Sequence, residues 1–272
     1  MTLVIGVATG DGLVLAADSR TTQALVDKPW RVLSDFTNKV FEVGRFAAAT
    51  AGWAFLSGRN VAAHMSEFVQ SFEELTKTPE DVAHELATYF ERLFNEDIAA
   101  GFDDAPPAGT SVLELYVAGY SGAIGETWQI SIPGPTIAKR YTTELGGALW
   151  QGQIDVVGRL IKGIDPTLVG RIAGDPSLIS ALSSLEPAID GLEYMLNLRL
   201  MNIQDAIDLA VLLIRTTIEV QRLTNGVVAE PGAFPGVGGP VQIALVTANG
   251  GFEWVQRTAI LGERPSGRAE DL

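Results

Sequence analysis

The sequence predicts an α+β fold, a four-layer αββα sandwich in a single domain. Strand-like and helical runs follow one another as hairpins, two helices, further strands, further helices and two last strands. The short turns between neighbouring strand-like runs predict hairpins and therefore mostly antiparallel sheets. Two pairs of amphipathic helices interleaved with these hairpins suit helices on both faces of a two-layered β core.

The composition is that of a globular protein. The chain has 272 residues, of which 47% are hydrophobic and 19% charged, enough for a large domain with a buried core. We find no run of about 18 apolar residues and no secretory signal pattern, so we expect a cytoplasmic protein without a membrane-spanning segment. A net charge of −14 disfavours a nucleic-acid partner. The sequence has no cysteine, which excludes a thiol nucleophile and disulfides.

Two hairpins open the chain. Asp11-Gly12 lies between two apolar runs rich in β-formers, which is a strong hairpin signal, and a tight turn at Gly44-Arg45 separates the next two. The strands expected here are 3–8, 13–17, 39–43 and 46–51.

Two amphipathic helices are expected next, at 53–77 and 80–98, separated at Thr78-Pro79. Pro79 suits the start of the second helix, because proline is tolerated where a helix has no hydrogen bond to lose. After a loop at 101–109, the expected strands are 111–120, 127–133 and 136–141.

Helical patterning returns at 148–162 and is strongest at 202–223, with patchy signal at 163–200 between them. After a loop rich in glycine and proline come the last expected strands, 241–247 and 252–257. We expect one domain over 1–262, with a helical insertion at 163–200 and a polar tail at 263–272.

The register of the two hairpins brings polar groups together. A first turn centred on Gly10-Asp11 pairs positions that sum to about 21, which places Thr2 opposite residue 18 or 19. The second hairpin places Lys39 opposite Thr50 and close to Gly52. Register alone leaves open whether the two hairpins are neighbours.

If the hairpins are neighbours, they assemble a nucleophile with its base. A threonine hydroxyl needs a base, and an N-terminal α-amine with a pKa near 8 suits that role at neutral pH. Lys39 would lower the pKa of that amine and stabilise negative charge, while Asp18 would orient the lysine. The backbone N–H of Gly52 could stabilise the oxyanion, since glycine allows close approach.

The residues around these positions resemble a known family. The stretches are TLVIGVATGDGLVLAADSRTT from Thr2, NKVFEV, AAATAGW, MNIQDAIDLAVLLIRTTIEVQR and VGGPVQIALVTANGG. They are similar to proteasome β-type subunits and bacterial proteasome-related proteins, which are N-terminal-nucleophile (Ntn) hydrolases with a catalytic threonine. The resemblance implies Thr2 as nucleophile, Asp18 and Lys39 as its support, Gly52 as oxyanion donor, and Thr21, Thr50 and Ala54 as lining of the specificity pocket.

The chain also departs from the family's pattern. Catalytic subunits carry a serine in a Gly-Ser-Gly turn before the third helix, and the stretch matched to it here reads Glu144-Leu145-Gly146-Gly147. Leu223-Thr224 and Gly236-Val237 stand near the family's aspartate and serine after the late helix. We expect removal of Met1 to expose Thr2, since a small second residue permits it.

Plainer interpretations exist for each residue. Thr2 is a β-former at a strand start, Asp18 suits a turn, and Lys39 suits an edge strand; only their joint placement points to catalysis. His64 and His84 are expected to be surface or lightly packed histidines on helices. Three functions remain: a threonine-type hydrolase of peptide or amide bonds, an inactive proteasome-like subunit, and an Ntn-type peptide transferase or ligase. The resemblance implies a peptide or protein substrate, a homo-oligomer and no cofactor.

Overall fold

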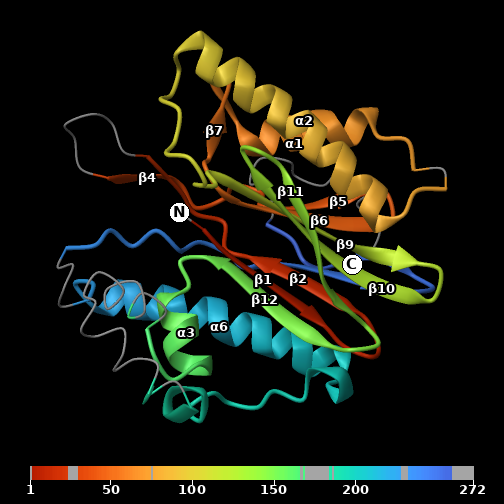
Figure 1. Ribbon diagram of the computed structural model, residues 1–272, viewed down its shortest axis with the longest axis vertical. Coiled ribbons are helices and arrows are strands. Elements are labelled where there is room, and N and C mark those ends of the chain that lie inside the picture. Colours follow the sequence, from red (N-terminus) through yellow and green to blue (C-terminus); the bar gives the residue numbers. More distant parts are fainter. Residues whose placement is uncertain are drawn as a thin grey trace, which may run out of the picture.

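A computed structural model gives the structure of residues 2–23, 30–74, 76–165, 168, 184–185, 187–227 and 232–258. Two five-stranded antiparallel sheets form its centre (Figure 1). The first sheet has the order β12 (Gly147–Gly152), β1 (Leu3–Ala8), β2 (Leu13–Ala17), β13 (Gln242–Thr247) and β14 (Gly251–Gln256). The second has the order β11 (Thr136–Thr142), β10 (Ile124–Ile132), β9 (Leu113–Ser121), β6 (Phe46–Gly52) and β5 (Val40–Val43).

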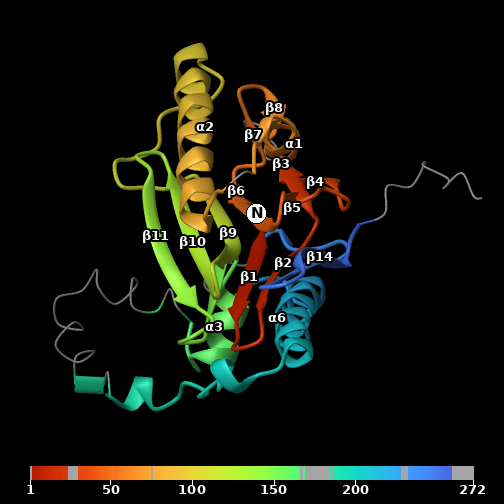
Figure 2. The ribbon, with the colours of Figure 1, turned by 90° about the vertical axis from the view of Figure 1, so that its right-hand side faces the viewer.

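Helices cover the outer face of each sheet (Figures 1 and 2). α1 (Val61–Ser71) and α2 (Pro79–Ala100) share an apolar core with the second sheet, and α3 (Asp155–Ile161) and α6 (Ile203–Leu223) share one with the first. A third core lies between the sheets, where the inward side chains of both meet. The predicted αββα sandwich is therefore confirmed. None of the helices in the described ranges is long and apolar enough to cross a membrane.

Local sequence sets the ends of the two long helices as expected. Thr78 caps α2 through a reciprocal pair of bonds with Asp81, and Pro79 is the first helical residue. Asn202 caps α6 by accepting a hydrogen bond from the Asp205 amide. The predicted helices at 80–98 and 202–223 are confirmed.

The helix predicted at 53–77 is wrong at both ends, since α1 spans only Val61–Ser71. Two short strands, β7 (Phe55–Leu56) and β8 (Arg59–Asn60), form a small hairpin at its start, and α1 begins only at Val61. Ser57 and Gly58 turn the chain with positive φ angles of 49° and 69°, a conformation that ends any helical path. Asn60 then caps α1.

The helix predicted at 148–162 is also wrong in its first half. Residues of β12 pair with β1 along its length, and only the seven residues of α3 are helical. A short apolar run such as Ala148-Leu149-Trp150 fits a strand as well as a helix, and pairing with β1 decides between them. A further two-stranded ribbon, β3 (Thr21–Gln23) with β4 (Arg31–Ser34), was not predicted.

The insertion predicted at 163–200 lies partly outside the described residues, as does the whole tail at 263–272. In its described end, residues 187–190 are helical and a 3-10 turn, η1 (Leu198–Leu200), follows before α6 begins. Several of its apolar side chains are exposed: Leu192, Tyr194, Met195 and Leu200.

Candidate active site

Both hairpin registers match the prediction. Val4 pairs with Ala17 in the first hairpin, which places Thr2 opposite residue 19, and Val40 pairs with Ala49 in the second. The Thr50 amide donates to the Lys39 carbonyl oxygen at 3.0 Å, so Lys39 and Thr50 stand opposite each other. The turns at 10–11 and 44–45 therefore fix which residues reach the ends of these strands.

The two hairpins belong to different sheets and meet face to face. The Lys39 ammonium, at the start of the second hairpin, lies 2.9 Å from Asp18 Oδ1, at the end of the first. The Asp18 side chain is fully buried and that of Lys39 nearly so. The question that register left open is answered by packing between the sheets rather than by strand pairing.

The Asp18 carboxylate is the centre of this arrangement. Its Oδ1 atom also accepts from the Leu3 amide at 3.0 Å, and Oδ2 accepts from the Arg20 and Gly238 amides at 3.1 and 3.0 Å. An ionised carboxylate has lone pairs for all four donors. Asp18 thus ties β1, β2 and the loop before β13 to the lysine.

Burial sets the acid–base behaviour of Lys39. Removal from water lowers the pKa of its ammonium below the ordinary value of 10.5, although the negative charge of Asp18 and its hydrogen bond act in the opposite direction. The nearby positive charge of Arg20 adds to the lowering. Lys39 therefore loses its proton at a lower pH than an exposed lysine does.

A small pocket lies beside the lysine. Six of the seven residues predicted for the site line it: Thr2, Thr21, Lys39, Thr50, Gly52 and Ala54. The seventh, Asp18, lies beneath the pocket against Lys39. The space open to the centre of a water molecule is about 20 Å³, roughly enough for one water. Thr2 itself is buried, with 5% of its surface exposed.

Gly52 forms the exposed end of β6 at the pocket wall. Its φ angle of +107° lies in the region that favours glycine, and a Cβ atom there would collide with the Val112 carbonyl oxygen. The next amide, that of Trp53, is already bonded to this oxygen at 2.8 Å. Only glycine fits at this position of the wall.

The Thr2 carbonyl oxygen is held from the side of β12. The Gln153 amide donates to it at 2.8 Å. Gly152, with a φ angle of +99°, packs directly against the same oxygen, and a Cβ atom there would collide with it. Sequence reasoning missed both residues, since nothing in the stretch Trp150-Gln151-Gly152-Gln153 points to Thr2.

Gln242 is a second residue that sequence reasoning missed. Its fully buried side chain accepts from the Lys39 and Val40 amides at 2.8 and 3.1 Å, and donates to Thr258 Oγ1 at 2.7 Å. It therefore fixes the backbone that carries Lys39. The available signal was a glutamine inside the apolar run Val241 to Val246.

An ion pair closes the rim of the pocket. The Arg20 guanidinium bonds both oxygens of Asp35, at 2.6 and 3.1 Å, and this contact raises the pKa of Arg20. Arg20 also donates to the Pro235 carbonyl oxygen at 3.2 Å. Nearby, the Thr21 hydroxyl donates to Thr37 Oγ1 at 2.7 Å, so one wall residue of the pocket is held in place.

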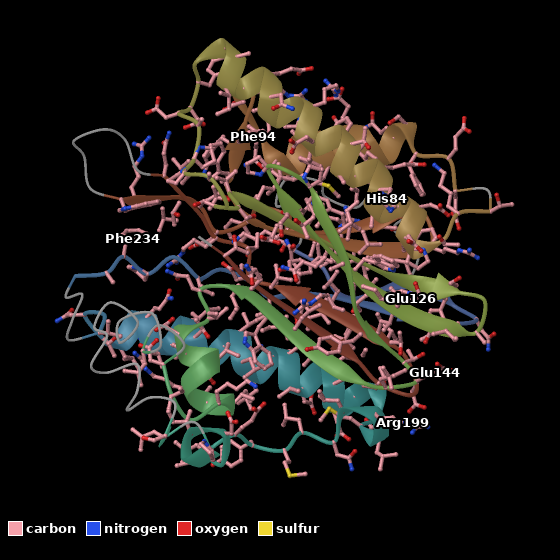
Figure 3. All side chains as sticks on the ribbon, viewed as in Figure 1. His84, Phe94, Glu126, Glu144, Arg199 and Phe234 are labelled. Atoms are coloured by element: carbon pink, nitrogen blue, oxygen red, sulfur yellow. The ribbon has the colours of Figure 1, made fainter. Side chains whose placement is uncertain are left out.

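The stretch matched to the family's serine turn needs correction. Residues 144–146 lie in the turn between β11 and β12, Gly147 begins β12, and Figure 3 shows Glu144 with Arg199 at the end of the molecule away from Phe234. The stretch just before α3 is Gly152-Gln153, which lies beside Thr2. Leu223 and Thr224, at the end of α6, are exposed.

The two histidines play no part in this pocket. His84 is exposed on α2, as expected (Figure 3). His64 is fully packed in the core, which corrects the expectation of a lightly packed residue; its Nε2 lies 2.9 Å from the Leu56 carbonyl oxygen. Within the described ranges, no group of three or more metal-ligating side chains occurs.

The fold places the chain in a structural class. Two antiparallel sheets between helical layers form an αββα sandwich that the chain shares with solved structures of Anbu proteins. Solved structures of Anbu proteins are among those similar to it. No protein-family model matches the sequence, and no curated protein matches it either.

Three Anbu structures define this similarity. Anbu of Pseudomonas aeruginosa, solved as a helical assembly, aligns with a TM-score of 0.54 and 15% identity over 96% of this chain and 88% of that one. A Gly-1 mutant of Anbu from Hyphomicrobium gives 0.52 and 16% identity over 97% and 89%. Anbu of Yersinia bercovieri, an ancestral β-subunit, gives 0.52 and 15% over 93% and 86%. At these identities the likeness is one of fold.

Proposed function

We propose that this chain is a threonine-type Ntn hydrolase that cleaves peptide or amide bonds as a proteasome-related, self-assembling subunit. The observation that carries the proposal is the buried Lys39–Asp18 pair, 2.9 Å apart, whose lysine lines one pocket together with Thr2. Burying a lysine and an aspartate is costly unless they are well bonded, and a reactive site is one reason to retain such a pair.

The proposed reaction begins when removal of Met1 frees the Thr2 α-amine. That amine takes the proton of the Thr2 hydroxyl as the oxygen attacks the substrate carbonyl carbon. The Lys39 ammonium stabilises the negative charge on the attacking oxygen, and the Gly52 N–H stabilises the oxyanion. The α-ammonium then protonates the leaving amine, and water hydrolyses the ester formed on Thr2.

The pocket suggests which substrates fit. Its open space of about 20 Å³ holds roughly one water, so a substrate side chain at the cleavage site needs more room than the pocket has. Thr50 and Ala54 in its wall are small, and the Thr21 hydroxyl is already bonded to Thr37. A substrate with a bulky residue at this position requires the wall to move.

A specific observation favours a second candidate, an assembly subunit that lacks activity. Gln153 stands before α3 where a serine is expected in the catalytic members of the resembled family.

A transferase or ligase on peptide bonds is the third candidate, and analysis of products formed with an added amine nucleophile separates it from a hydrolase.

Covalent labelling by a β-lactone tests the proposal, because it needs the nucleophile but not the natural substrate. We expect intact mass to show one adduct per chain, and Thr2→Ala to abolish it. Lys39→Met should slow labelling by about a hundredfold or more, because both the alkoxide and the amine lose their electrostatic support. Thr136→Ala, at an exposed position of β11, is the control. Labelling that survives Thr2→Ala would assign the chemistry to another residue.

A further inference from the structure

The peptide bond between Thr2 and Leu3 is held at both ends. Its carbonyl oxygen accepts from the Gln153 amide at 2.8 Å, and its N–H donates to Asp18 Oδ1 at 3.0 Å. A peptide plane fixed at both polar atoms has no freedom to rotate. Because the Thr2 side chain and α-nitrogen branch from the adjoining Cα, their direction depends on these two bonds.

The two anchors are connected to each other through a second glutamine. Gln221, in the last turns of α6, donates its Nε2–H to Gln153 Oε1 at 2.5 Å and accepts from the Val237 amide at 2.9 Å through Oε1. The next amide, that of Gly238, donates to Asp18 Oδ2 at 3.0 Å. The chain of bonds thus returns to the carboxylate that holds the Leu3 N–H.

We propose that Gln153 and Gln221 are positioning residues that lock the Thr2–Leu3 peptide, and with it the nucleophile, in the reactive orientation. They act from outside the pocket: Gln153 through its backbone N–H, and Gln221 by fixing the Gln153 side chain. Neither touches the substrate in this account. The inference rests on the proposed function of Thr2 for its kinetic consequences, but the bond network stands independently of it.

The chemistry of glutamine fits this link. A glutamine amide offers a donor and an acceptor on one group, so Gln221 can donate to Gln153 and accept from Val237 at once. The network joins five segments: β1, the end of β2, the segment before α3, the end of α6 and the loop before β13. Misplacement of a reacting group by about 1 Å can cost about a hundredfold in rate, so loosening one segment affects the nucleophile.

Gln221→Met removes the link while keeping the length of the side chain. We expect the maximal rate of covalent labelling by an epoxyketone, reached at saturating reagent, to fall by about ten- to a hundredfold. The concentration for half-maximal rate should stay within about twofold, because the pocket walls are unchanged. Gln204→Met is the matched control, since Gln204 lies on the same helix and donates to Asp208 Oδ1 at an exposed site.

Gln221→Glu tests the bond itself. Its carboxylate can still accept from Val237, and the Gln153 amide can turn to donate its Nε2–H, so the rate should recover to within a few-fold of wild type. Gln153→Met should resemble Gln221→Met, and the double variant should be no slower than either single one, as expected for one shared interaction. If Gln221→Met fails to fold, Gln153→Met takes its place in the labelling experiment.

Hydrogen exchange of the 147–155 peptide separates this inference from the proposed function. In Gln221→Met the Gln153 amide should exchange faster, with unchanged exchange in α2 and no change in Gln204→Met. An unlabelled wild-type protein would overturn the hydrolase proposal while faster exchange still supports the network. Wild-type rate and wild-type exchange in both glutamine variants would overturn the positioning inference.

Discussion

Lys39 and Asp18 are joined by a buried ion pair of 2.9 Å, although Lys39 directly precedes a strand of one sheet and Asp18 directly follows a strand of the other. The pair fastens the two sheets at the end where Thr2 lies. Asp18 also holds three backbone amides, so the position of the ammonium is tied to β1, β2 and the loop before β13. A shift of either sheet would therefore change the environment of Thr2.

The pair predicts the pH dependence of the Thr2 reaction. As the pH increases, the rate should first rise because the α-amine loses its proton, and then fall because Lys39 loses its proton. Burial lowers the pKa of Lys39 below 10.5. Asp18 raises that pKa, so Asp18→Asn should move the alkaline fall to lower pH.

The measurement is the labelling rate of Thr2 against pH, with Glu42→Gln as the control, because Glu42 is an exposed carboxylate on the strand that follows Lys39. An alkaline fall that stays in place or moves upward in Asp18→Asn would contradict the role given to the pair.

Gly152 predicts a steric effect on Thr2. A methyl group at Gly152 would strike the Thr2 carbonyl oxygen and also force an alanine into a φ angle of +99°. We expect Gly152→Ala to slow labelling by at least about tenfold and to lower the free energy of unfolding by about 1–3 kcal/mol.

Gly134→Ala is the matched control for Gly152→Ala. Gly134 also has a positive φ angle, +66°, but among the described residues, its two chain neighbours apart, no heavy atom lies within 4 Å of the place that its Cβ would take. If both variants slow labelling equally, backbone strain in general, and not contact with Thr2, is the cause.

Gln242 predicts a loss of stability. Gln242→Leu leaves the Lys39 and Val40 amides without their buried acceptor, and unpaired buried groups cost about 1–3 kcal/mol. Urea unfolding measures the change, with Gln256→Leu on exposed β14 as the control. A Gln242→Leu protein as stable as wild type would show that water satisfies these amides.

The exposed apolar side chains before α6 predict where copies of the chain meet. Met195 is 98% exposed and Tyr194 71%, which is unusual for side chains of this size in a monomer. We expect light scattering to give an oligomeric mass, and Met195→Asp to reduce it toward the 29.0 kDa of one chain. Met195→Gln, uncharged and of similar length, should dissociate the assembly less. A monomeric wild type at micromolar concentration would contradict the assembly.

The part of the site that local sequence determines was predictable. The turns at Gly10-Asp11 and Gly44-Arg45 set the hairpin registers, and register alone placed Asp18 near Thr2 and Lys39 opposite Thr50. The capped ends of α2 and α6 follow from Thr78 and Asn202 in the same way. Short-range rules suffice wherever the partners lie within one hairpin or one helical turn.

The rest of the site depends on contacts between distant segments. Gln242 meets Lys39 across about two hundred residues of chain, and Gln153 meets both Thr2 and Gln221. A single sequence does not show which distant residues contact each other. The wrong helix at 148–162 has the same cause, since β12 is a strand only because β1 lies beside it.

The most direct test of the account is the mass-spectrometric location of an epoxyketone adduct. This reagent joins a hydroxyl and a neighbouring free amine, so it reports both parts of the proposed nucleophile together. We predict an adduct on an N-terminal peptide that begins at Thr2, with its α-amine blocked to amine reagents. An unmodified N-terminal peptide that still carries Met1, or an adduct at any other residue, would contradict catalysis by Thr2.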